Sequence, residues 1–538
     1  MSKKMSYILP VFFLLFSFIL LTGCEISPAR SDSQEPAFDD NVLVGEVTTL
    51  VQFQAVPVRG YGVVAGLPGT GSGECPPALR TELERFISKK IPHDANFNAR
   101  RFLGSNNTAV VEVIGTIPTL ASPEQTFDVR LIPFSRSQTL SLDGGYLYTT
   151  ELKEMSRFVR YDQFARSLAE AHGQVFRDPF ASPDTPLQWY SLGGGIVKNE
   201  VKISLAINQP SFKAASIIRN AINERFGSKT ATAVSEEEIR LRIPARFHHN
   251  KLRFLQMIRS IYLSNDPENR YQKRDDFLRD LVEQDNKYPA EIALEAFGKN
   301  VVQPLKSLLS SSDPAVRFHA ARCLLYIGDE NGFNALRETA MDPSSPYRID
   351  SIKAFEAVSG SKPVENVLVQ LVADPDIQIR IAACDQLLNM NSFSVKRMIV
   401  ADSFVIDTVF SAGPKAVYVF CQKAPRIVLF GSPIRCSENM FIQSDDGTVT
   451  INALPGSKYL SVSRKHPNRP RVIGPIKSTR DLASLIRILG ESSEIENRIT
   501  YPGLSIPYMN ICQLLKKICD NEAVAASFYV GPLAQISY

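Results

Sequence analysis

The stretch that most constrains the fold of this 538-residue chain is Gly60-Tyr61-Gly62-Val63-Val64-Ala65-Gly66-Leu67-Pro68-Gly69-Thr70-Gly71. Glycines at this density let the backbone take positive φ or approach another strand closely. The first six residues match the G-x-G-x-x-A pattern of a dinucleotide-binding turn, but that turn must open a helix that faces the pyrophosphate. Glycine and proline follow at once, and the Lys-Ser/Thr of a P-loop is absent. The stretch therefore favours glycine-rich β structure and excludes a nucleotide site.

Strands and helices are predicted on both sides of this stretch. Residues 42–75 are β-rich, and Asp143-Gly144-Gly145 predicts a turn before the next strand. Within 126–133, Phe127, Val129 and Leu131 alternate with charged residues, which is typical of a half-buried strand. Strands are predicted at 108–118, 126–133, 146–150, 198–205 and 238–244, and helices at 79–90 and 211–226, the last of which Gly227 ends.

Strand signals are almost absent between about 275 and 400. Asp-Pro pairs begin at 313, 342 and 374, and Asp before Pro favours a helix start because Asp caps and Pro loses no bond in the first turn. Alanine pairs follow two of them, at 320–321 and 382–383, and let paired helices approach closely. This pattern resembles HEAT repeats and predicts an α-solenoid.

Strand signals return at about 401. Strands are predicted at 416–421, 426–430, 448–452 and 525–530, helices at 479–489 and 506–521, and a basic loop at 464–480. The predicted fold class is therefore α+β, with β-rich regions split by an inserted, HEAT-like α-solenoid segment. A composition of 44% hydrophobic and 22% charged residues is that of a globular protein, and a net charge of +4 gives no argument for nucleic acid.

The N-terminus has the features of an export signal. Lys3 and Lys4 precede an apolar run, 7–20, that is too short to cross a bilayer, and Leu-Thr-Gly-Cys at 21–24 follows. This sequence resembles a bacterial lipobox, which implies cleavage before Cys24 and lipid on that residue. An ordinary signal peptide that ends near a cysteine is the alternative. Residues 25–40 are rich in Ser, Pro and acidic side chains and predict a flexible tether.

The remaining seven cysteines contain no C-x-x-C pair, so a zinc or thioredoxin-type site is not supported. Cys421 and Cys436 flank a possible hairpin and are the candidate disulfide. Because seven is odd, at least one thiol is expected to stay unpaired within the chain.

Residue types for chemistry do not cluster in this sequence. The six histidines show no metal-ligand spacing, and no G-x-S-x-G elbow occurs, so we expect no catalytic, cofactor or metal residues and no enzyme. The basic stretch at 464–480 has two interpretations: it is a solvated loop, or it contacts an anionic partner. The residues for such a contact are Arg464, Lys465, Arg469 and Arg471.

Several blocks of this sequence resemble the flagellar P-ring protein family. The glycine-rich stretch 60–71 is similar to the early signature of that family, and 107–118, 127–129, 142–147 and 208–226 fit the blocks that follow. The similarity continues more faintly at 426–429, 481–485 and 506–521. The family glycine motif is carried by Gly60, Tyr61, Gly62, Gly66, Gly69, Gly71, Gly144 and Gly145.

The resemblance implies a structural ring subunit. It predicts P-ring-like regions at 42–265 and 401–538. The N-terminal pattern adds a signal peptide at 1–23 and a lipidated tether at 24–41, and the helical repeats add a HEAT-like insertion at 266–400. It also implies a ring of many copies around the flagellar rod in the periplasm, with the rod, outer-membrane ring proteins and peptidoglycan as partners. The lipid would anchor the chain in a membrane, with the outer membrane favoured. Typical family members lack the lipid and the insertion, so the alternative is a non-flagellar envelope lipoprotein that binds a partner through its helical repeats.

Overall fold

The computed structural model describes residues 38–51, 54–90, 98–134, 136–155, 167–178, 180, 188–199, 203–358, 360–465, 472–492, 494–496, 499–501 and 503–533. The chain divides into two units, 1–40 and 41–538, and the elements below belong to the second. The predicted signal peptide and Cys24 lie outside the described residues, as does most of the tether. No helix within the described ranges is long and apolar enough to cross a membrane. The fold is mixed α and β, as predicted.

The first body is an antiparallel sheet that closes on itself, here called the closed sheet. Its strand order is β4-β3-β2-β5-β6-β8-β7, and β4 also pairs with β8. The strands are β2 (Val56–Ala65), β3 (Thr108–Ile117), β4 (Thr126–Pro133), β5 (Tyr146–Glu154), β6 (Ser167–Gln174), β7 (Phe176–Arg177) and β8 (Trp189–Val197). Phe127, Val129 and Leu131 point into its core, which confirms the face predicted from their alternation.

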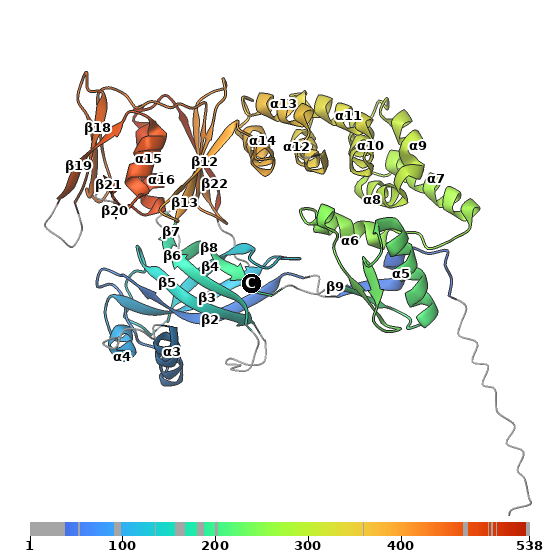
Figure 1. The fold of residues 1–538 in the computed structure, drawn as a ribbon, viewed down its shortest axis with the longest axis horizontal. Coiled ribbons are helices and arrows are strands. Elements are labelled where there is room, and N and C mark those ends of the chain that lie inside the picture. The colour runs from blue at the N-terminus through green and yellow to red at the C-terminus, as the bar shows by residue number, and fades with distance from the viewer. Residues whose placement is uncertain are drawn as a thin grey trace, which may run out of the picture. The chain divides into compact units, whose positions relative to one another are not determined.

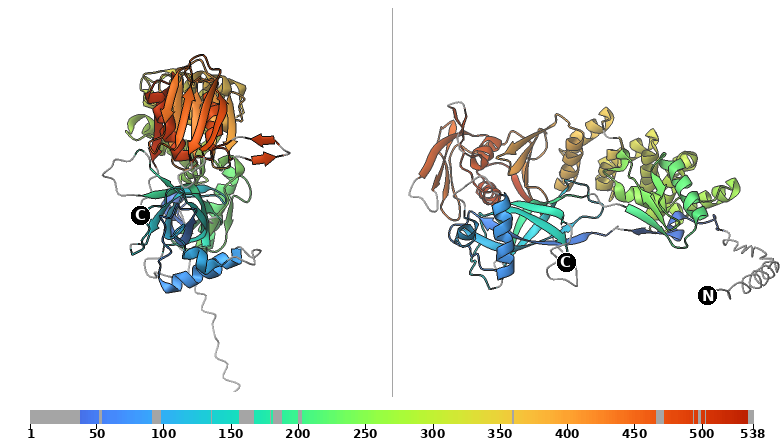
Figure 2. Two further views of the ribbon diagram at one scale, coloured as in Figure 1. Left: turned by 90° about the vertical axis from the view of Figure 1, so that its left-hand side faces the viewer. Right: turned by 60° about the horizontal axis from the view of Figure 1, so that its bottom comes forward.

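Two helices cover part of the other face of the closed sheet. They are α3 (Pro77–Lys90), close to the predicted bounds, and the five-residue α4 (Ala99–Leu103). Leu79, Leu83 and Leu103 pack on Val63 and Val110, whose strand neighbours point into the sheet's core. Figures 1 and 2 show both helices on the outer side of this sheet.

The second body is the small sheet, with strand order β1-β9-β11-β10. Its strands are β1 (Thr48–Val51), β9 (Ile203–Ile207), β10 (Ala231–Ala233) and β11 (Glu238–Leu241), and its helical elements are α2 (Val44–Val47), α5 (Phe212–Phe226), η2 (Ala245–Phe247) and α6 (Lys251–Arg259). The helical turn α2 interrupts a stretch predicted as continuous β structure. In α5, Gly227 follows the last turn, as predicted, Ser211 caps the first turn, and Phe212 is exposed.

The third body is the helical segment, 267–389, which contains no strand among its described residues. It comprises α7 (Pro267–Glu283), α8 (Tyr288–Phe297), η3 (Gly298–Val301), α9 (Val302–Leu308), α10 (Pro314–Ile327), α11 (Glu330–Met341), α12 (Arg348–Ala354), η4 (Phe355–Val358), α13 (Lys362–Leu371) and α14 (Ile377–Asn389). That these helices form HEAT-type repeats stays a prediction.

Only one of the three Asp-Pro pairs begins a helix as predicted. Asp313 caps α10 by accepting a hydrogen bond from the N–H of Ala315 at 2.8 Å. Asp342 instead follows the end of α11, and Asp376 takes the cap of α14 in place of Asp374. At Asp342 and Asp374 the side chain accepts a backbone N–H in an Asx turn, and no helix begins at the proline that follows. The Asp-Pro pair alone therefore does not identify a helix start.

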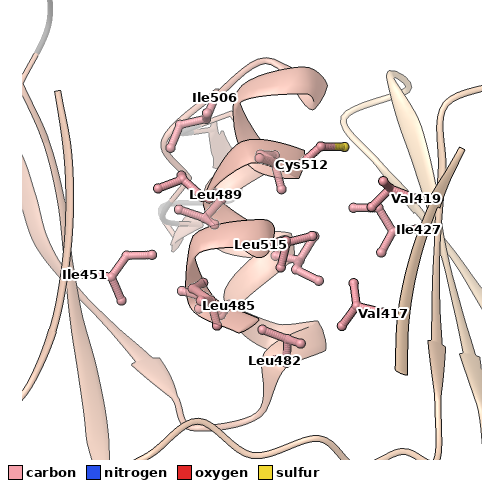
Figure 3. Packing of buried hydrophobic residues seen from close by; sticks show 14 of the residues in the cluster. Val417, Val419, Ile427, Ile451, Leu482, Leu485, Leu489, Ile506, Cys512 and Leu515 are labelled. Carbon is pink, nitrogen blue, oxygen red and sulfur yellow. The ribbon is translucent and has the colours of Figure 1, made fainter. Parts of the chain in front are cut away.

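The fourth body, the C-terminal sandwich, has two helices between two sheets (Figure 3). One sheet has the order β12-β13-β15-β14-β22, the other β16-β17-β18-β19, and β20 pairs with β21. The strands are β12 (Val395–Val400), β13 (Phe404–Val409), β14 (Ala416–Cys421), β15 (Arg426–Phe430), β16 (Met440–Gln443), β17 (Val449–Ala453), β18 (Tyr459–Lys465), β19 (Val472–Thr479), β20 (Glu494–Glu496), β21 (Ile499–Tyr501) and β22 (Ser527–Leu533), and the helices are α15 (Leu482–Gly490) and α16 (Tyr508–Asp520).

Two boundaries in this region differ from the prediction. The first strand after the helical segment begins at Val395 and not at about 401. The predicted basic loop 464–480 is largely two antiparallel strands, because Lys465 closes β18 and 472–479 form β19. β19 is mostly exposed and lacks the alternating apolar pattern by which strands are recognised.

Candidate functional site

The glycine motif lies where β2 passes closest to β5. The register between these strands breaks between Arg59 and Val64. A Cβ on Gly60 would lie 2.2 Å from the carbonyl oxygen of Glu151, and one on Gly62 would lie 2.0 Å from Oγ1 of Thr150. No side chain fits at such distances, so these glycines allow the two paired strands to lie this close together.

The turn at Gly144 and Gly145 packs against the strand that carries Gly60 and Gly62. The N–H of Gly71 donates to the carbonyl of Asn106 at 2.8 Å. A Cβ on Gly145 would lie 2.4 Å from Cγ1 of Val64, so the turn before β5 packs directly against β2. Tyr61 stacks on Phe134 with ring centroids 5.8 Å apart. The motif is thus a packing site within the closed sheet.

The other predicted site residues are spread over the C-terminal sandwich. Arg464 donates to the carbonyl of Ser505 at 3.0 Å and also to that of Leu504, so it is engaged within the chain, while Lys465 is exposed. Arg469 and Arg471 lie outside the described residues. The predicted disulfide is not formed, because Cys421 and Cys436 are both free, buried thiols.

A buried ion cluster, which the sequence did not reveal, joins the small sheet to the helical segment. This Glu291 cluster consists of Arg253 on α6, Glu291 and Glu295 on α8, and His319 and Arg322 on α10. Arg253 donates to Glu291 at 2.5 Å and to Glu295 at 2.7 Å. Arg322 donates to both oxygens of Glu291, at 2.7 and 2.6 Å, and Nδ1 of His319 lies 2.5 Å from Oε2.

The electrostatics of this cluster differ between its two carboxylates. Burial by itself raises the pKa of Glu291. The charge of Arg253 and the hydrogen bonds with His319 and Arg322 outweigh that effect and hold the pKa well below its ordinary range. At Glu295, burial dominates and raises the pKa despite the contact with Arg253. Glu291 is therefore the ionised centre of the cluster.

Further contacts bind the same surfaces together. Arg225 on α5 donates to the carbonyls of Glu295 and Ala296, both at 2.8 Å, at the end of α8. The hydroxyl of Tyr288 donates to Gln256 on α6 at 2.6 Å. These bonds satisfy groups that would otherwise be unpaired, and they fix α8 on the small sheet.

A second charged group joins the helical segment to the C-terminal sandwich. The carboxylate of Asp407 on β13 is fully buried and accepts from Arg397 at 2.7 Å and from Arg426 at 2.5 Å. Arg426 also donates to Asp385 on α14 at 2.6 Å. The helical segment is thus held at each end by charged hydrogen bonds to a different β body.

These arrangements hold structure and offer no evident chemistry. Within the described ranges, no group of three or more His, Cys, Asp or Glu side chains could hold a metal ion. The charged side chains of the Glu291 cluster neutralise one another in a dry site. Such a site suits a protein whose modules must keep fixed positions.

Residues 44–271 are similar to known proteins. Residues 44–271, which contain the closed sheet, the small sheet and α6, match the family model described as flagellar P-ring protein. The flagellar P-ring protein of Thermotoga maritima is 28% identical over 223 residues, covering 38% of this chain and 62% of the relative. That of Methylobacillus flagellatus is 27% identical over 219 residues, covering 38% and 57%. That of Yersinia pseudotuberculosis is 27% identical over 226 residues, covering 39% and 57%.

The aligned part of this chain spans about three fifths of the length of these curated relatives. The aligned part includes the whole glycine motif and the close approach of β2 to β5. Residues 44–271 are thus similar to the flagellar P-ring protein family. The helices from α8 onward, with both of the Glu291 cluster's carboxylates, lie outside the matched range.

Proposed function

We propose that this chain is a structural subunit of a flagellar P-ring and not an enzyme. The observation that carries the proposal is that the matched range 44–271 contains all the described strands of the closed sheet, including the close approach of β2 to β5 at Gly60 and Gly62. A ring around a rotating rod needs rigid subunits that contact one another closely. Its partners would be further copies of this chain, the rod and the outer-membrane ring, with the peptidoglycan around them.

Deleting the gene in its host tests this role. We expect hook–basal bodies without a P-ring in electron micrographs and loss of swimming, both restored by the wild-type gene. A Gly62→Val gene should fail to restore them, and a Gly69→Asn gene should succeed, because open space surrounds Gly69. Normal swimming and complete basal bodies in the deletion strain would refute the proposal.

The export and anchoring of the chain form a separate part of the proposal. A charged start, a short apolar run and Leu-Thr-Gly-Cys support cleavage before Cys24 and lipid attachment there, which would place the chain in the periplasm on a membrane. Several acyl chains on one residue would hold it durably, with the outer membrane as the favoured site. Metabolic labelling with a fatty acid should mark the wild type and leave Cys24→Ser unmarked.

A non-flagellar envelope lipoprotein is the second candidate. It is favoured by the helical segment, most of which lies outside the range that matches the P-ring family. In that role the proposed HEAT-like repeats would bind a protein partner. Crosslinking of the full chain in cells, followed by mass spectrometry, should then yield inter-protein crosslinks concentrated at 267–389, in cells whose swimming does not depend on the gene.

A further inference from the structure

The closed sheet and the C-terminal sandwich meet at one carboxylate. Asp128 on β4 accepts a hydrogen bond from the N–H of Gly193 at 2.8 Å through Oδ1, and one from the N–H of Lys423 at 2.8 Å through Oδ2. Lys423 lies in the turn between β14 and β15, 295 residues further along the chain. Asp128 thus links a strand of the closed sheet to a backbone turn of another body.

The closed sheet is specially shaped at this point. The residues that flank Asp128 pair with Ser191 and Gly195, so residues 192–194 form a bulge opposite it. Gly193 has φ of +61°, and a Cβ there would lie 2.5 Å from the carbonyl oxygen of Lys423. A bulge of this kind redirects a strand locally. Here it makes a notch that accepts the turn only because residue 193 has no side chain.

A small apolar contact surrounds the notch. Phe176 and Leu192 of the closed sheet are buried in the core of the C-terminal sandwich. The ring of Phe176 lies edge-on to that of Tyr508, with centroids 6.3 Å apart, and the ring centroids of Phe180 and Phe528 are 6.2 Å apart. Among the described residues of the closed sheet, two apolar side chains are buried in this core, and Phe180 and Tyr190 pack beside them.

The junction between the helical segment and the C-terminal sandwich is far more extensive. The two bodies share one hydrophobic core, in which Leu387 of α14 packs in the same cluster as Phe430 of β15. Arg426 adds its ion pair with Asp385 across the same boundary. These two bodies are expected to move as one, so any separation would occur at the notch.

Desolvation of Asp128 limits the strength of the notch contact, although both of its oxygens accept an N–H bond there. Burial raises the pKa of Asp128, and the two N–H donors and the charge of Lys423 offset this only in part. The partly buried carboxylate therefore loses hydration that it would regain when the turn leaves. A contact of this kind holds a defined geometry without being permanent.

We propose that Asp128 and Gly193 form a releasable clasp, from which the Lys423 turn undocks while every body of the chain stays folded. The C-terminal sandwich would then separate from the closed sheet at this junction. The inference rests on the contacts inside one chain and does not depend on the flagellar role.

Hydrogen exchange of the full chain, read by mass spectrometry, tests the clasp. Peptides containing Gly193 and Lys423 should exchange at the same rate, about tenfold or more faster than the core of β2, β3, β13 and β15. Asp128→Asn and Gly193→Ala should each speed exchange at both peptides and leave those cores unchanged. Lys423→Gly is the matched control, because it keeps the N–H donor and suits the φ of +61° at that position.

Two results would overturn the proposal. In one, the Gly193 and Lys423 peptides exchange only together with the strand cores, which means that the junction opens by global unfolding. In the other, Asp128→Asn and Gly193→Ala accelerate exchange throughout the chain to the same extent, which means that they destabilise a single fused body. The two substitutions lie on different strands, so a folding defect of one would not mask the other.

Discussion

The carboxylate of Glu291 accepts two hydrogen bonds from the guanidinium of Arg322 in a site that excludes water from the carboxylate. Because Arg253 reaches the same carboxylate from α6, this pair of residues on α8 and α10 is also tied to the small sheet. α6 lies within the range that matches the P-ring family, and α8 and α10 lie beyond it. The helical segment is thus anchored to the family-matched region through side chains whose charges cannot be left unpaired.

Removing the central charge should destabilise this junction strongly. In Glu291→Gln, the guanidinium of Arg322 loses its carboxylate partner and that of Arg253 keeps only Glu295. Breaking such a buried pair typically costs about 3–5 kcal/mol. Urea denaturation of the full chain should show this loss. The exposed pair Lys353–Asp350 provides the control, since Asp350→Ala should change the free energy of unfolding by about 0.5 kcal/mol or less. Equal losses in both variants would show that the buried cluster has no special weight.

The same cluster predicts two pH dependences of opposite sign. The folded pKa of Glu291 lies below its ordinary value of 4.5, so its contribution to stability is present above that value and is lost as the pH falls. The folded pKa of Glu295 is raised, so its contribution is present at low pH and is lost as the pH rises through the folded value. Other carboxylates, Asp313 and Asp329 among them, also have lowered pKa values, so urea midpoints measured against pH should lose part of their acid-side slope in Glu291→Gln. In Glu295→Gln they should instead lose slope above the ordinary value, and the reverse assignment would contradict this description.

The strands that the sequence predicted well have strong local patterns. The range 126–133 alternates apolar and charged residues, and 416–421 and 426–430 are short runs of β-branched and aromatic side chains. In each, one face or both faces are buried, so the periodicity of burial appears in the sequence. The exposed strand 472–479 has no such requirement, and it was predicted as a loop.

The junctions could not be predicted, because their partners are distant in sequence. Glu291 and Arg253 are 38 residues apart, and Asp128 and Lys423 are 295 apart. Single charged residues of this kind carry no periodicity or spacing that distinguishes them from surface charges. Only Gly193, within the run 193–195 of three glycines, gave a local signal of close backbone approach.

The close approach of β2 to β5 predicts that a side chain added at a glycine of the motif destabilises the sheet to an extent that depends on the position. A Cβ at Gly62 would meet Oγ1 of Thr150 at 2.0 Å, so Gly62→Val should destabilise the closed sheet by about 1–3 kcal/mol or more. Gly69 has φ of +81° and open space around it, and Asn tolerates this conformation, so Gly69→Asn should cost about 0.5 kcal/mol or less. The single tryptophan, Trp189 on β8, reports unfolding of this sheet by fluorescence. If both variants lose the same stability, the close approach of β2 to β5 is not the reason for glycine at position 62.

The cysteines predict a graded reactivity that also tests the absence of a disulfide. Burial raises the pKa of Cys421 and of Cys436 to about 12, so almost no thiolate is present at pH 8. Cys75 is only half-buried, and its pKa is raised less strongly by burial, which Arg80 partly offsets. Iodoacetamide should therefore modify Cys75 in the folded chain well before Cys421 or Cys436, and all three should react in urea, as measured by mass spectrometry of peptides. Failure of Cys421 and Cys436 to react in urea without a reductant, with reaction restored by one, would show that the two are joined after all.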